Sequence, residues 1–146
     1  MKKKKELHFY GVALTILALF DLCMLLIGFL RGDYAMVTTD DALVQTVTNV
    51  IIIVVVGCAA LSVLGGAYLG VKGIMESKKP TGGRLHIVIA KFAMVLNFVL
   101  AGFMALTLFG TDNFFDDFTT TGLCVVDAMF MYCYMKAAIA VRNGEE

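Results

Sequence analysis

The sequence IIIVVV occupies positions Ile51–Val56, in the first half of a 28-residue segment without a charged residue, Val44–Val71 (VQTVTNVIIIVVVGCAALSVLGGAYLGV). A helix on the surface of a soluble protein needs a polar face, and this run offers none. The whole segment is also too long to be one buried strand. Because a transmembrane helix needs about 20 apolar residues, we predict that this segment spans a membrane.

Three further apolar segments have lengths of 22, 25 and 22 residues: Phe9–Leu30, Leu85–Phe109 and Thr120–Val141. None of them alternates in polarity as the strands of a membrane barrel do. Only helices and closed barrels satisfy their backbone hydrogen bonds in lipid. We therefore expect one all-α membrane domain, an antiparallel four-helix transmembrane bundle with short connectors at residues 31–43, 72–84 and 110–119.

The composition of the whole chain favours the membrane as well. The 146 residues are 60% hydrophobic and 16% charged, whereas an average soluble domain is about 45–50% apolar and about 25% charged. The 12 Lys and Arg residues balance the 12 Asp and Glu residues, so no net charge attracts nucleic acid. The partner that we expect is the lipid bilayer.

The basic residues predict the orientation of the spans. Nine of them fall near the two ends of the chain or in the connector 72–84: Lys2, Lys3, Lys4, Lys5, Lys72, Lys78, Lys79, Arg84 and Arg142. The other two connectors contain one basic residue, Arg31. The positive-inside rule therefore predicts that both termini are cytoplasmic. We expect a multi-pass protein of the bacterial inner (plasma) membrane.

Each span contains one strongly polar residue in its outer half or near its midpoint: Asp21, Asn49, Asn97 and Asp127. An ionisable group at such a depth is costly and therefore indicates a functional site. Two neighbouring carboxylates can hold a proton or a cation between them, and we expect these four residues to form such a cluster. In the alternative, the four side chains only hydrogen-bond the helices to one another.

Small residues recur at helical spacing on two spans, and we expect them to pack helices together: Gly66, Gly70, Ala93, Ala101 and Ala105. Asn97 belongs to the same face as the alanines, which predicts that it points inward. Lys91 and Lys136 lie near the inner ends of the third and fourth spans. Their side chains can reach the membrane surface, where we expect contact with anionic lipid or with anions.

Motifs for enzymatic chemistry are missing. His8 and His86 have no second metal ligand at helical spacing, and the four cysteines form no C-x-x-C pair, so we expect no metal and no cofactor. A pair of intramembrane aspartates also occurs in intramembrane aspartyl proteases, but their Gly-x-Gly-Asp motif is absent around Asp21 and Asp127. We therefore expect a protein that is not an enzyme.

Two functions fit this sequence. The first is a small transporter or channel-like protein, homo-oligomeric because four spans alone enclose little volume, that binds a proton or a cation. The second is a non-catalytic accessory, scaffold or immunity-type protein in a larger membrane complex. Such a protein would act through its helix faces and through an outer loop that contains Phe114, Phe115 and Phe118.

Overall fold

The computed structural model describes residues 2–80, 83–107 and 114–144, and all regular structure within them is helical. The four helices are α1 (Lys2–Arg31), α2 (Ala42–Lys78), α3 (Leu85–Thr107) and α4 (Phe114–Arg142). Each of them is long and apolar enough to cross a membrane. The prediction of four membrane-length helices is thereby confirmed.

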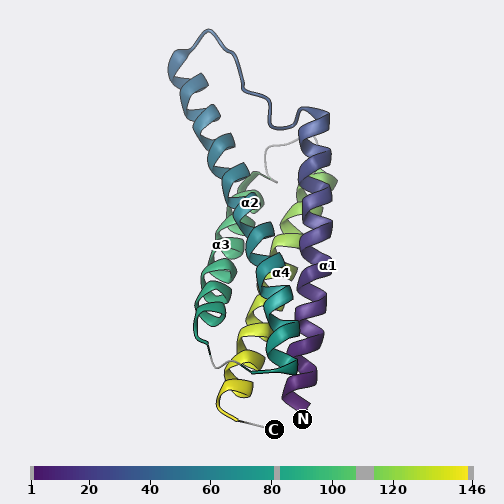
Figure 1. The fold of residues 1–146 in the computed structure, drawn as a ribbon. Coiled ribbons are helices and arrows are strands. Elements are labelled where there is room, and N and C mark those ends of the chain that lie inside the picture. The colour runs from purple at the N-terminus through teal and green to yellow at the C-terminus, as the bar shows by residue number, and fades with distance from the viewer. Residues whose placement is uncertain (1, 81–82, 108–113, 145–146) are drawn as a thin grey trace.

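The helices form one bundle in which α1 lies along α2 and α3 lies along α4. Figure 1 shows both termini at the same end of this bundle, which we call the terminal end. Residues 32–41, which connect α1 to α2, lie at the opposite end, the loop end. Toward the loop end α2 leans away from α1, so the bundle is splayed there and narrow at the terminal end.

Glycines bring α1 and α2 together in the half of the bundle near the termini. A Cβ atom added to Gly70 would lie 2.8 Å from the backbone nitrogen of Thr15 and 2.9 Å from the carbonyl oxygen of Gly11. A Cβ atom added to Gly66 would lie 3.3 Å from that of Ala18. The two helices therefore touch almost backbone to backbone, as small-xxx-small motifs permit.

The half of α2 near the loop end has no comparable glycine contact with α1. Gly57, the glycine nearest the loop end of this helix, has no heavy atom within 4 Å of where a Cβ would stand. The β-branched run Ile51–Val56 precedes it, and Ile51, Ile53 and Val54 are exposed. Bulky side chains and the lack of a close glycine contact allow the helices to diverge.

Two helix ends are capped by local sequence. Gly32 follows α1 with φ of 80°, and the Asp33 N–H donates to the Gly28 carbonyl at 3.0 Å, which is the Schellman pattern that favours glycine. Asp41 precedes α2, and its carboxylate accepts hydrogen bonds from the N–H groups of Leu43 and Val44 at 2.9 and 3.2 Å. These caps fix the ends of residues 32–41.

Three of the helices, α1, α2 and α4, are longer than the apolar segments that predicted them. α1 begins at Lys2, α2 continues to Lys78, and α4 begins at Phe114. Residues 72–78 and 114–119, which we expected to be connectors, are therefore helical. A helix continues past the apolar segment until a residue breaks it, and Pro80, just after the C-cap Lys79, is the first breaker after α2.

The buried core lies mainly in the half near the termini and includes Leu7, Leu14, Leu69, Met131 and Tyr134. Large apolar side chains elsewhere point outward, and Ile16, Leu64 and Phe92 are each more than 60% exposed. Soluble monomers rarely expose apolar patches larger than a few hundred Å². The apolar outer surface and the four long helices indicate a multi-pass integral membrane protein.

Candidate functional site

A cavity of about 680 Å³ lies between the four helices in the splayed half of the bundle. Asp21, Asp127, Ser62 and Asn97 contribute polar groups to its wall. Apolar side chains from all four helices complete the wall, among them Met24, Leu25, Val63, Leu100, Met104 and Leu123. The side of the cavity near the loop end is lined by Arg31, Asp33 and Tyr34.

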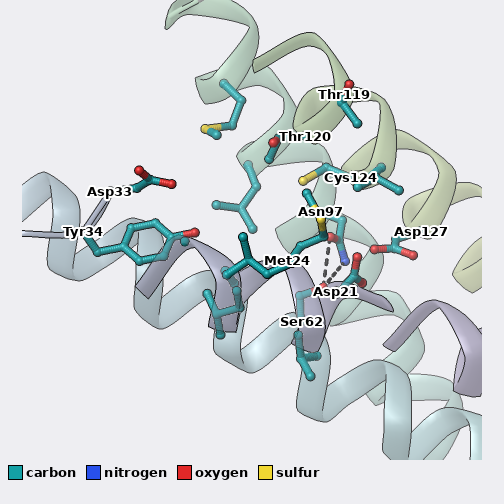
Figure 2. A pocket seen from close by; sticks show the side chains of 18 of the residues that line it. Asp21, Met24, Asp33, Tyr34, Ser62, Asn97, Thr119, Thr120, Cys124 and Asp127 are labelled. Carbon is teal, nitrogen blue, oxygen red and sulfur yellow. Dashed lines mark hydrogen bonds between the residues drawn. The ribbon is translucent and has the colours of Figure 1, made fainter. Parts of the chain in front are cut away.

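Asp21 of α1 and Asp127 of α4 meet at the deep end of this cavity (Figure 2). The two side chains line the same space, and their charges interact there. Asp127 is 5% exposed, whereas Asp21 is half-buried. Two neighbouring carboxyl groups in a poorly solvated site do not readily carry two negative charges, so this pair can hold a proton and, after releasing it, a cation.

Asn97 and Ser62 form a second polar contact in the cavity wall. The Ser62 hydroxyl donates to Asn97 Oδ1 at 3.0 Å and accepts from Asn97 Nδ2 at 2.8 Å. Asn97 Nδ2 also donates to the Ala93 carbonyl at 3.0 Å, and the residue is 1% exposed. This amide therefore joins α2 to α3 near the middle of the bundle (Figure 2).

The contact between Ser62 and Asn97 predicts a measurable coupling. In a double-mutant cycle of Ser62→Ala and Asn97→Ala, we expect a coupling free energy between about 0.6 and 1.7 kcal/mol, which are the average and the largest value for hydrogen bonds between membrane helices. Reversible unfolding in mixed micelles measures it. The pair Ser62→Ala and Ala105→Gly, whose members do not touch, is the control. A coupling no larger than that of the control would contradict the prediction.

Asn49 lies outside the cavity, which differs from the expected grouping. Its Oδ1 accepts from the Val37 N–H at 2.8 Å and its Nδ2 donates to the Val37 carbonyl at 3.2 Å. Asn49 therefore anchors residues 32–41 to the half of α2 near the loop end. The physical reason is that α2 leans away from α1 toward the loop end, where the Asn49 amide bonds the connector residue Val37.

Tyr34 covers the side of the cavity near the loop end. Its ring lies against Gly28, where an added Cβ atom would come within 2.6 Å of it, and packs edge to face on Phe29 at 5.0 Å between ring centroids. Burial, and then the Asp33 carboxylate, raise the pKa of Tyr34. The phenol is therefore neutral at physiological pH.

Cys124 lines the cavity, whereas Cys58 and Cys133 do not. We expect a positively charged, water-soluble thiosulfonate to modify Cys124 faster than Cys58 and Cys133, because Cys124 alone of the three lines the cavity and the carboxylates there attract a cation. Peptide mass spectrometry of the full chain in liposomes measures the three rates. Equal slow modification of all three cysteines would mean that the cavity is dry.

A separate polar group is buried near the terminal end. Glu76 of α2 forms an ion pair with Lys72 at 3.2 Å and is 3% exposed. His86 of α3 and Tyr134 of α4 pack edge to face with ring centroids 6.2 Å apart. The void beside Glu76 and His86 measures about 10 Å³, which is about the volume that one water needs. This half of the bundle is therefore closed.

The other predicted residues lie as follows. Gly66 and Gly70 contact α1, Ala93 and Ala101 are buried, and Ala105 is half-buried. Lys91 and Lys136 are exposed on the helix surfaces, and the Lys136 ammonium lies 4.8 Å from the Tyr132 ring centroid. Phe118 is exposed. The side chains of Phe114 and Phe115 lie outside the described residues, and so does Phe109.

Several residues that shape the site carry a weaker signal in the sequence. Ser62 stands four residues before Gly66, so the spacing of Ser62, Gly66 and Gly70 could have placed it on the inward face of α2. Tyr34 and Glu76 fall in segments expected to be connectors. Nothing in their local sequence shows that they are covered by other helices.

Comparisons of this chain with protein-family models, with curated proteins and with solved structures give no match. The functional assignment therefore follows from the geometry of the cavity and the chemistry of its wall.

Proposed function

We propose that this chain is a small membrane transporter or channel-like protein that binds a proton or a cation at the Asp21–Asp127 pair. One observation carries the proposal: carboxyl groups from α1 and α4 meet in the wall of a 680 Å³ cavity. Side chains that served only as packing contacts would be enclosed in a filled core, as in the half near the termini. Open space beside the carboxyl groups gives an ion a route to them.

Asn97 and Ser62 extend this binding site. Both line the same cavity as the aspartates and offer neutral oxygen atoms. A cation that loses water in the cavity needs such oxygens beside the carboxylates, because hard cations prefer oxygen ligands. One chain already forms the site, so the proposal needs no second copy. A homo-oligomer stays a prediction.

The proposal includes the orientation of the chain. In an antiparallel bundle with cytoplasmic termini, the terminal end with its nine basic residues faces the cytoplasm, as the positive-inside rule favours. The cavity then opens toward the outer side of what we propose is the bacterial inner membrane. In this arrangement, the cavity can take up an ion from the outside or release one to the outside.

Lysine labelling tests the orientation. On intact cells, an impermeant amine reagent is expected to leave Lys78 unmodified and to modify it after permeabilisation. The variant Thr39→Lys adds an amine to the exposed connector 32–41 and is the positive control. Modification of Lys78 on intact cells would reverse the proposed sidedness.

Ion flux tests the function. Full-length protein in liposomes is expected to carry protons, monitored with an enclosed pH dye, or a monovalent cation, monitored as radioactive rubidium or sodium. The double variant Asp21→Asn/Asp127→Asn keeps the size of both side chains and is expected to carry neither. Equal flux in the wild type and the double variant, with both proteins folded, would overturn the proposal.

A further inference from the structure

The cavity is much larger than the proposed binding pair requires. A monatomic cation is held by oxygen atoms at about 2.0–2.6 Å, which needs only a compact cage. The cavity measures about 680 Å³, and cavities of about 300–1,000 Å³ hold drug-sized organic molecules. Within the part of the chain that the structure describes, no group of three His, Cys, Asp or Glu side chains is placed to hold a metal ion.

Charge in the cavity is arranged by depth. Asp21 and Asp127 lie at the deep end, and Arg31 is the one basic side chain among the described residues that line the cavity. Arg31 is ten residues from Asp21 along α1, or about 15 Å at the rise of an α-helix. The deep end therefore attracts a positive group and repels an anion.

The remaining wall is apolar and adaptable. Leu25, Val63, Leu100 and Leu123 offer hydrocarbon surface, and Met24 and Met104 add flexible thioethers that adjust to ligands of different shape. At the other side, the Tyr34 ring adds aromatic surface to the wall. Figure 2 shows Met24 between this ring and the two aspartates.

Because the cavity combines an acidic deep end with an apolar wall of drug-sized volume, we propose that its substrate is a lipophilic organic cation. This inference rests on the proposed function, since it names what the transporter carries. The positive group of the substrate lies at Asp21 and Asp127, and its apolar groups lie against the leucines and methionines.

Binding of tetraphenylphosphonium to the full chain in nanodiscs tests the inference, with empty nanodiscs subtracted. Tetraphenylborate has the same shape and the opposite charge, so it is the matched control ligand. We expect the wild type to bind the phosphonium at least tenfold more tightly than the borate. Asp127→Asn is expected to lose at least tenfold in phosphonium affinity, and Asp40→Asn, in the exposed connector, to lose none.

The size of the cavity is tested separately. Ala59 lines the cavity, and Ala59→Trp is expected to fill part of it and to weaken phosphonium binding at least tenfold. Val54→Trp places the same side chain on the exposed face of the same helix and is expected to bind as the wild type does. Circular dichroism confirms that each variant is folded.

The outcomes separate this inference from the proposed function. Proton or sodium flux that depends on the aspartates, without specific phosphonium binding, would contradict the inference that the substrate is an organic cation. The proposed function would still stand. Equal binding of phosphonium and borate, or binding unchanged in Asp127→Asn, would also overturn the inference. Phosphonium binding that Asp127→Asn and Ala59→Trp both abolish would support it.

Discussion

Asp127→Asn alone is expected to lower flux through reconstituted protein to the rate of protein-free liposomes. Asp127 is 5% exposed and faces Asp21 across the cavity wall. Asparagine has nearly the same shape but can neither hold a negative charge nor release a proton. An ion that needs the pair would then meet only one carboxylate in a largely apolar surrounding. Tracer uptake and an enclosed pH dye measure the loss.

Asp33→Asn is the matched control for this prediction. Asp33 also lines the cavity, but it is exposed at the side near the loop end. Water screens an exposed charge, so its removal changes little. We expect flux within about twofold of the wild type. Flux that survives in Asp127→Asn, or that falls equally in both variants, would show that the buried pair is not the binding site.

Gly70→Leu is expected to destabilise the protein by about 3 kcal/mol, the upper end of the range for an overpacked core. Even the Cβ atom would lie 2.8 Å from the Thr15 nitrogen and 2.9 Å from the Gly11 oxygen. Both of these are backbone atoms, so α1 must move away from α2 as a whole. Unfolding in mixed micelles, followed by circular dichroism, measures the change.

Gly57→Leu provides the comparison on the same helix. No heavy atom lies within 4 Å of its added Cβ, so the new side chain would project freely, and leucine favours a helix more than glycine does. We expect its stability to equal or exceed that of the wild type. If Gly57→Leu and Gly70→Leu lowered the free energy of unfolding by the same amount, the close contact of α1 with α2 would not be what stabilises the half of the bundle near the terminal end.

The same glycine contact explains why the cavity exists. Gly11, Gly66 and Gly70 allow α1 and α2 to touch near the terminal end. In the other half of α2, which contains the β-branched run Ile51–Val56, no glycine makes such a contact. The helices therefore diverge toward the loop end, and the space between them is the cavity. The sequence contains the G-x-x-x-G motif, but its contacts on α1, Ala18 for Gly66 and Gly11 for Gly70, lie 48 and 59 residues earlier.

The polar residues differ in direction more than in depth. Asp21, Asp127 and Asn97 line one cavity, in line with their similar depths. Asn49 has a similar depth too, yet it binds the backbone of Val37. Depth follows from position in a helix, whereas direction depends on how each helix is rotated and tilted against its neighbours.

The sequence by itself determined that four helices are long and apolar enough to cross a membrane. The length of an apolar segment depends only on the residues of that segment, so it is evident from the sequence before the fold is known. Only the tertiary structure decided that Asp21 meets Asp127, that Ser62 pairs with Asn97, and that a cavity separates α1 from α2. These pairings depend on backbone contacts between distant glycines, because such contacts set the tilt at which two helices cross.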